Sequence, residues 1–139
     1  MALTFGPRRG MVLACDFQTG FKPPEMVKVR PVVIMAEPTA HRPGLCTVIP
    51  LSTTAPIPVM PYHHRMKAVS LPAAWGSRDV WAKCDMIYAV SCERLDRILV
   101  RDHGQRRYVY SNACSGDLEA IRHGILHSLG MGNLITPPS

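Results

Sequence analysis

The stretch of sequence that decides the fold is residues 28–54, KVRPVVIMAEPTAHRPGLCTVIPLSTT. It holds two short apolar runs, residues 29–35 and 45–51, which are rich in Val and Ile and are separated by a polar segment with Pro and Gly. Short β-branched runs bounded by turn residues are typical of β-strands. Pro31 has no amide hydrogen to donate to a ladder, so we place it at the start or an edge of its strand. The stretch therefore predicts two strands separated by a turn region.

The same pattern extends outward from this stretch. Residues 18–28 contain too much Gly and Pro to be anything but a long loop. Residues 102–105, Asp-His-Gly-Gln, form a good hairpin turn. Further strands are predicted at residues 10–17, 67–71, 80–91, 98–101 and 106–110. Residues 55–66, with three prolines, are expected to form an exposed loop or an irregular edge.

One stretch near the C-terminus is convincingly helical. Ser115 is the expected N-cap, and Asp117 and Glu119 fall in the first turn, where carboxylates oppose the helix dipole favourably. Gly130 stands where a C-terminal cap belongs. The apolar stripe of this helix consists of Leu118, Ile121, Ile125, Leu126 and Leu129. We therefore predict five to seven short strands followed by one helix that packs across a β-barrel.

Length and composition favour a single soluble domain, with a core at about residues 10–130 and flexible ends. The 139 residues leave no room for two independent cores, and 47% of them are hydrophobic. The five cysteines have neither zinc-ligand nor redox spacing, so we expect buried free thiols in a reducing cytoplasm. No apolar run approaches the ~20 residues that cross a bilayer, and no secretory signal precedes the first strand. We expect a cytoplasmic protein that does not enter a membrane.

The net charge of +6 raises the expectation of a polyanionic partner, because phosphate contacts supply most sequence-independent affinity for nucleic acid. Arg30 stands at a strand entrance after a loop that carries Glu25 and Lys28. Its planar guanidinium suits a phosphate, or else a structural carboxylate such as Glu25 or Asp85. Both readings stay open on the sequence alone.

Two further clusters have residues suited to chemistry. Ser52, Thr53 and Thr54 end an apolar strand, where hydroxyls bind phosphate oxygens or cap a turn. Lys83 and Asp85 alternate along the expected strand 80–91 and would then share one face. They would form either an acid–base pair or a surface ion pair worth little.

The order of these clusters resembles the PemK/MazF family of type II toxin–antitoxin endoribonucleases. The resemblance spans roughly residues 10–130. It is carried by residues 10–13 with Asp16 and Phe17, then KVRPVVI at 28–34, VIPLSTT at 48–54, KCD at 83–85, Val90, Arg94-Leu95 and the closing helix. It implies an SH3-like β-barrel with a C-terminal helix, a homodimer, and cleavage of single-stranded RNA without metal or cofactor.

The resemblance also implies roles for individual residues. Arg30 would contact the scissile phosphate, Ser52 or Thr53 would match the family's Thr/Ser, and Asp85 would match the acidic residue used as a base. Lys83 falls where the family carries an arginine, and Glu25 matches a polar loop residue. Cleavage by the 2′-hydroxyl, which gives a 2′,3′-cyclic phosphate, also needs an acid for the leaving oxygen; we choose Lys83, with His63 and His64 as rivals. The expected substrate-binding residues are Glu25, Lys28, Thr54, His63, His64 and Arg65.

The expected partners are single-stranded RNA, cut sequence-selectively, and a small acidic antitoxin, because an acidic peptide can occupy an RNA site by mimicking its charge. Trp75, Trp81, Tyr62 and Tyr88 are available to stack on bases, although core packing is the default for each. Cations that could follow the RNA backbone are Arg42, Arg65, Lys67 and Arg78. Met86, where the family often has Gln, and a loop without His leave two alternatives open. One is a catalytically inactive toxin-like barrel that binds a protein, such as a topoisomerase; the other is a nucleic-acid-binding module.

Overall fold

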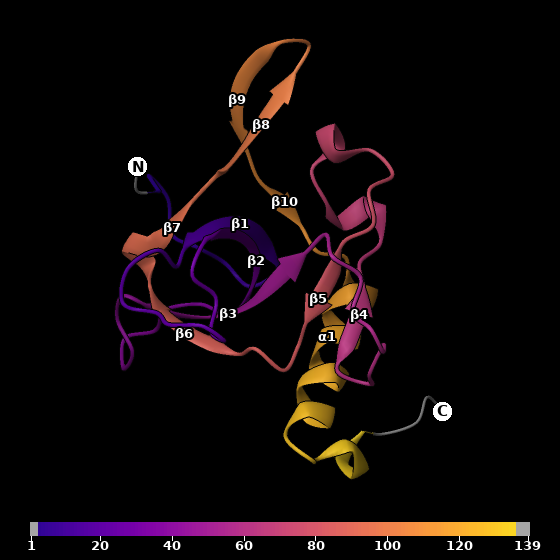
Figure 1. Cartoon of the computed structure of the whole chain (residues 1–139). Coiled ribbons are helices and arrows are strands. Elements are labelled where there is room, and N and C mark those ends of the chain that lie inside the picture. The colour runs from indigo at the N-terminus through magenta and orange to yellow at the C-terminus, as the bar shows by residue number, and fades with distance from the viewer. Residues whose placement is uncertain (1–2, 136–139) are drawn as a thin grey trace.

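The structure, a computed structural model, describes residues 3–135 and is mainly β with one α-helix (Figure 1). Its strands are β1 (Met11–Asp16), β2 (Val29–Ala36), β3 (Leu45–Ser52), β4 (His63–Arg65), β5 (Trp81–Lys83), β6 (Tyr88–Ser91), β7 (Leu95–Asp96), β8 (Ile98–Asp102), β9 (Gln105–Val109) and β10 (Ser111–Asn112). The helix α1 spans Ser115–Ser128, and the 3-10 turns are η1 (Ala68–Ser70), η2 (Ala73–Trp75), η3 (Cys92–Arg94) and η4 (Gly132–Leu134).

Eight strands form one curled antiparallel sheet with the order β10-β1-β2-β3-β5-β4. β7 pairs with the end of β1, and β6 pairs with the first half of β3, while β5 pairs with its last two residues. A register shift between Ile34 and Ala36 of β2 marks a bulge, a feature that increases local bending and twist. The sheet curls into a half-barrel, as expected for the predicted fold class.

Both faces of the sheet are buried, because successive side chains of a strand point to opposite faces. One face carries Val33, Ile49, Leu51 and Ala82 and packs against Ile121 of α1; we call it the helix side. The other face carries Leu13, Val32, Ile34 and Val48 together with Phe17, and residues of the 18–28 loop cover it; we call it the loop side. Phe17, Phe21 and Tyr88 hold that loop in place, with ring centroids 5.1 to 5.6 Å apart.

The β8–β9 hairpin stands apart from the sheet, at the opposite end of the molecule from α1 (Figure 1). His103 and Gly104 form its turn with φ of +51° and +78°, the conformation that a two-residue hairpin requires. Ile98 and Val100 are buried against the helix side, whereas Leu99 is 45% exposed on the other face of the hairpin. The sequence placed this hairpin within one residue at each end.

Four sequence-based expectations about local structure were wrong. Residues 3–135 form ten short strands, not five to seven. Residues 67–71 do not form a strand; η1 lies there, and Ser70 is buried beside α1. The expected strand 80–91 is two strands, β5 and β6, because a turn closed by Met86 N–H and the Lys83 carbonyl (3.0 Å) interrupts it. The N-cap of α1 is Cys114, and Ser115 is already helical. The apolar patterns were read correctly, but tertiary contacts decided where each element ends.

Other expectations were confirmed. The five cysteines are free thiols, three of them buried. Residues 18–28 form a loop, and Gly130 follows the helix with φ of +73°. No helix among residues 3–135 is long and apolar enough to cross a membrane. The expected flexibility of the chain ends concerns residues 1–2 and 136–139, which lie outside the described residues.

Candidate functional site

The register of the sheet brings five of the eleven predicted site residues onto its loop side. Ser52 of β3 is the cross-strand partner of Trp81 of β5, and Trp81 is the partner of Arg65 of β4. β2 and β3 pair through Val32 and Pro50, and continuing that register by two residues places Arg30 across from Ser52. Directly opposed residues of antiparallel strands share a face and lie about 5 Å apart. We call Arg30, Ser52, Trp81 and Arg65 the site row.

A second row lies beside the site row on the same face. Lys83 follows Trp81 by two residues and pairs with His63, which precedes Arg65 by two. Side chains two apart in a strand point the same way. Lys83 and His63 therefore share the loop side with Arg30 and Ser52, although they come from distant parts of the sequence.

Arg30 is half-buried, and within residues 3–135 its guanidinium forms no ion pair or side-chain hydrogen bond. The two carboxylates considered as structural partners, Glu25 and Asp85, are not bonded to it. Glu25 instead accepts a hydrogen bond from Lys22 N–H at 3.0 Å, which closes a turn in the loop. A partly exposed arginine without a partner is free to bind an anion, which favours the phosphate reading over the structural one.

Ser52 and Thr53 differ in their surroundings. The Ser52 hydroxyl accepts a hydrogen bond from Thr54 N–H at 3.1 Å and keeps its own hydrogen free to donate. Thr53 follows the last residue of β3 and is exposed. By strand alternation, its side chain points to the face opposite to that of Ser52. Of the two hydroxyls that the sequence left open, Ser52 is the one that the register places beside Arg30.

His63 and His64 are adjacent in sequence but lie on opposite faces of β4. His63 Nδ1 accepts a hydrogen bond from Met60 N–H at 3.0 Å, so a neutral His63 ring carries its hydrogen on Nε2. His64 pairs with Ala82 on the helix side, and its Nε2 lies 2.7 Å from Asp117 Oδ1. The structure thus brings His63 to the site rows and ties His64 to α1.

Arg65 lies in the site row but is already paired, since its guanidinium donates to the Asp79 carboxylate. Both side chains are about 60% exposed, at 62% and 59%, so the pair is open to solvent and can exchange for a phosphate. Lys28 and Thr54 are exposed at the edge of the same region, before β2 and after β3 respectively. They lie at the ends of the strands that carry Arg30 and Ser52.

The charges of Asp85 and Glu25 act on the Tyr88 hydroxyl. Burial raises the pKa of Tyr88, the hydrogen bond with Met26 N–H (2.9 Å) lowers it, and the charges of Glu25 and Asp85 raise it further. Tyr88 pairs with Val48, which in turn pairs with Ile34 on the loop side. Asp85 itself is exposed in the turn after β5, so its strand alternation with Lys83 does not hold. Both carboxylates are thus close enough to Tyr88 for their charges to act on its pKa.

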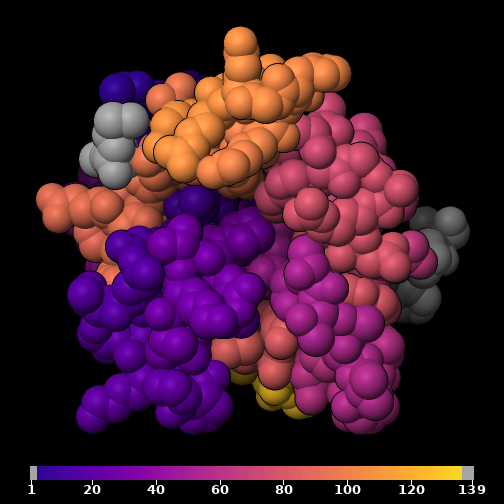
Figure 2. Space-filling model, turned by 45° about the horizontal axis from the view of Figure 1, so that its top comes forward, coloured from indigo at the N-terminus to yellow at the C-terminus, as the bar shows by residue number. Residues whose placement is uncertain are grey.

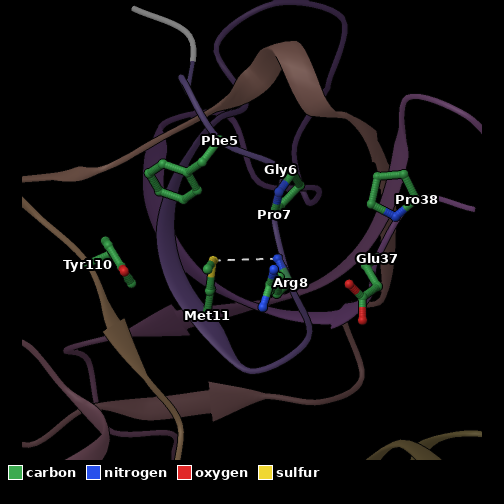
Figure 3. Close-up of a pocket in the computed structure, with 8 residues that line it drawn as sticks. All are labelled: Phe5, Gly6, Pro7, Arg8, Met11, Glu37, Pro38 and Tyr110. Carbon is green, nitrogen blue, oxygen red and sulfur yellow. Dashed lines mark hydrogen bonds between the residues drawn. The ribbon is translucent and has the colours of Figure 1, made fainter.

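A cavity of about 570 Å³ lies elsewhere (Figure 3). Phe5 and Tyr110 form one wall of it, Glu37 and Pro38 the other, and Met11 lies at its base. None of the predicted site residues lines it. Among residues 3–135 no three His, Cys, Asp or Glu side chains come together in a way that would hold a metal ion.

A family model described as "PemK-like, MazF-like toxin of type II toxin-antitoxin system" matches residues 8–107. The chain belongs to the PemK/MazF toxin family. The matched range holds both site rows and most of the β8–β9 hairpin, and it ends before α1.

Solved structures agree with the PemK/MazF fold. MazF from Deinococcus radiodurans is 19% identical, with a TM-score of 0.64 over 91% of this chain and 99% of that one. A mycobacterial endoribonuclease is 16% identical, with a TM-score of 0.61 over 91% and 94% of the two chains. A mycobacterial endoribonuclease in complex with its cognate antitoxin is 19% identical, with a TM-score of 0.58 over 94% and 99%. No curated protein sequence matches significantly.

Two features of this PemK/MazF chain had no clear sequence signal. Asp117 looked like a surface carboxylate in the first turn of a helix, yet it is fully buried and bonded to His64, Ser70 and Lys67. Trp81 looked like a core residue, yet it is half-buried in the middle of the site row. Strand alternation from Ser52 and Arg65 would have found Trp81 only if the pairing of β3, β4 and β5 had been known.

Proposed function

We propose that the chain is a metal-independent, sequence-selective endoribonuclease toxin that cuts single-stranded RNA and leaves a 2′,3′-cyclic phosphate. The observation that carries this proposal is the register of β2 and β3, which, continued two residues past the Val32–Pro50 pair, sets Arg30 across from Ser52. Arg30 has no ion pair among residues 3–135. Together the two side chains supply a fixed charge and a hydrogen-bond donor to one phosphate. Family membership supports the same activity, and the mycobacterial relative's description as an endoribonuclease agrees with it.

The chemistry follows from the residues around that phosphate. The 2′-oxygen attacks the phosphorus, the bond to the 5′-oxygen breaks, and charge develops on the equatorial oxygens. Arg30 and the Ser52 hydroxyl stabilise that charge, a contribution that is typically worth 10²–10³-fold in rate for one such donor. Asp85 accepts the 2′-proton and Lys83 donates a proton to the leaving 5′-oxygen. The proton count then balances without any further group.

The remaining predicted residues bind the RNA around that centre. His63 offers its Nε2 hydrogen beside Lys83, and Arg65 exchanges Asp79 for a phosphate. Trp81, half-buried between Ser52 and Arg65, presents a ring on which an unstacked base can lie. Glu25, Lys28 and Thr54 complete the edge of the groove. His64 has a structural role instead, because its Nε2 is bonded to buried Asp117.

The deciding experiment is cleavage of a long single-stranded RNA by purified protein in excess EDTA, beside Arg30→Ala and Arg122→Ala. Arg122 lies on the exposed surface of α1, so its loss matches the change in charge without touching the site. We expect cutting by the wild type and Arg122→Ala, cyclic-phosphate ends, and a loss of at least about 100-fold in Arg30→Ala. No cutting by folded wild type would favour the catalytically inactive barrel that binds a protein.

We also propose that the toxin works in the cytoplasm as a homodimer and is neutralised by a small acidic antitoxin. The charge of +6 supports an acidic partner, and one relative is described as a complex with its cognate antitoxin. Light scattering at micromolar concentration tests the dimer, and a monomeric mass would refute it. An antitoxin that inhibits cleavage in competition with RNA would support the shared site.

A further inference from the structure

A second basic surface lies between η2 and the β8–β9 hairpin, outside both site rows. A cavity of about 210 Å³ is lined there by Ala74, Trp75, Arg78, Leu99, Val100 and Arg101. We call Trp75, Arg78 and Arg101 the hairpin pocket. Figure 2 shows the orange hairpin meeting the pink surface of the η2 region, above a depression between the purple and magenta surfaces. The pocket thus joins two segments that lie more than 20 residues apart in sequence.

Local geometry fixes the aromatic part of this pocket. Trp75 ends η2 and is half-buried, packing against the helix-side cluster. A tight turn follows, in which Arg78 N–H donates to the Trp75 carbonyl at 3.3 Å. This turn brings the Arg78 guanidinium to 5.9 Å from the centre of the Trp75 ring. One part of the ring is anchored in the core, while another part lines the cavity beside a cation.

The charge of the pocket is not neutralised by the protein. The two nearest carboxylates in the sequence are already engaged, since Asp79 is paired with Arg65 and Asp102 with Arg107 at 2.7 Å. Arg78 and Arg101 form no ion pair among the described residues. Arg101 is moreover the direct cross-strand partner of Arg106. Like charges directly opposite in a hairpin are destabilising, so this arrangement favours an anionic ligand.

We propose that the hairpin pocket binds one nucleotide of single-stranded RNA beyond the cleavage site, with the base against Trp75 and a phosphate between Arg78 and Arg101. An aromatic face flanked by guanidinium groups matches a base and its phosphate together. An acidic peptide would use the charges but leave the ring without a partner. RNA is therefore the occupant that all three side chains fit.

The position of the pocket requires a substrate that extends beyond the site rows. Arg78 precedes Trp81 of the site row by three residues, so the alternation of an extended chain turns the two side chains to opposite faces. Trp75 likewise packs with the helix-side cluster, whereas the site row lies on the loop side, so an RNA that occupies both passes around the edge of the sheet. The proposal rests on the proposed nuclease function and adds to it a nucleotide-binding position outside the cleavage site. RNA long enough to reach the pocket is bound more tightly than RNA that covers only the site rows.

The test uses fluorescence anisotropy with 2′-O-methyl RNA, which cannot be cleaved because the attacking hydroxyl is blocked. A short oligonucleotide of about 3 residues and a long one of about 12 are titrated onto wild type, Arg78→Gln/Arg101→Gln and Arg122→Gln. Both pocket arginines are exposed and unpaired, so the double variant keeps the fold. We expect its affinity for the long probe to fall about tenfold, with a salt slope lower by ~0.7, because one phosphate contact is lost. Affinity for the short probe, and both affinities of Arg122→Gln, stay at wild-type values.

A second variant, Trp75→Leu, separates stacking from charge. It keeps an apolar side chain against the core and should weaken the long probe by about 5- to 100-fold without changing the salt slope. Wild-type affinities in both variants would overturn the pocket, even if the wild type cleaves RNA in EDTA. Pocket-dependent binding without any cleavage would support the pocket and refute the nuclease. If the double variant lost affinity for a polyglutamate peptide but kept wild-type affinity for RNA, the RNA assignment would be overturned in favour of an acidic protein.

Discussion

His64 Nε2 lies 2.7 Å from Asp117 Oδ1 and joins β4 to the first turn of α1. Asp117 is fully buried, and its other oxygen accepts hydrogen bonds from Lys67 N–H at 3.0 Å and from the Ser70 hydroxyl. The Ser70 hydroxyl oxygen in turn accepts a hydrogen bond from Cys114 N–H at 2.9 Å, at the helix N-cap. This network holds the helix against the back of the strands that carry the site rows.

The Asp117 network should make stability depend on pH. Burial raises the pKa of Asp117, but hydrogen bonds from Ser70, His64 and Lys67 outweigh it and bring that pKa below its ordinary value of 3.8. A lowered folded-state pKa contributes stability that is present above the ordinary pKa and lost as the pH falls through the folded pKa. We expect Asp117→Asn to cost about 2 kcal/mol at pH 7, with the deficit shrinking below about pH 4.

Urea unfolding at pH 7 and pH 3, at one fixed protein concentration, measures this difference. Asp102→Asn is the matched control, because its carboxylate is paired with Arg107 on the solvent-accessible hairpin. Its effect should stay at or below about 1 kcal/mol. An Asp117→Asn deficit that is the same at both pH values would contradict a charged, hydrogen-bonded Asp117.

Gly124 should not tolerate a methyl group, although alanine is the better helix former. A Cβ at this position would lie 2.8 Å from both Cβ and Sγ of Cys84, on the segment that follows β5. Cβ of Cys84 moves only with the backbone, so the helix would have to shift. We expect Gly124→Ala to lower the free energy of unfolding by about 1–3 kcal/mol.

Gly116→Ala in the same helix is its control, measured by the same denaturation. There the new methyl group meets only the end of the flexible Lys67 side chain, at 3.2 Å. We expect this variant to be neutral or up to about 1 kcal/mol more stable. Equal stability of the two variants would mean that α1 does not pack closely on Cys84.

The cysteines should separate into two groups under alkylation. Burial raises the pKa of Cys15 and Cys84 to about 12, and burial together with the Cys92 thiol at 3.3 Å raises the pKa of Cys46 to about 12. At pH 8 only about one in ten thousand of these thiols is then ionised, and the thiolate is the reactive form. Iodoacetamide followed by mass spectrometry should modify Cys92 and Cys114 first. Rapid native labelling of Cys84 would contradict the packing of α1.

Ser52 and Thr53 should differ in their effect on RNA cleavage. The register places Ser52 beside Arg30, whereas Thr53 lies beyond the last residue of β3. We expect Ser52→Ala to lower kcat by about 10²–10³-fold and Ser52→Thr to restore most of it. Thr53→Ala should stay within about twofold of wild type in the same assay. A larger loss of kcat in Thr53→Ala than in Ser52→Ala would assign the active hydroxyl to Thr53.

Much of this protein was determined by sequence alone. The runs at residues 29–35 and 45–51 form strands because Val and Ile favour a pleated, buried surface, and His103-Gly104 turns the hairpin because such turns need positive φ. The order of the motifs KVRPVVI, VIPLSTT and KCD, with the strands and helix around them, also carried the resemblance to the PemK/MazF family, which the family model then showed. These features depend on local preferences and on motif order.

Tertiary structure decided which of the predicted residues meet. Adjacent His63 and His64 point to opposite faces of β4, and only the pairing with β5 shows which face belongs to the site. Strand alternation is known from the sequence, but a shift of one residue in register exchanges the two faces. Asp117 was buried, and Trp75, Arg78 and Arg101 were brought together, by contacts between distant segments. Local sequence does not predict such contacts, because they depend on how the sheet curls and where the hairpin and helix lie upon it.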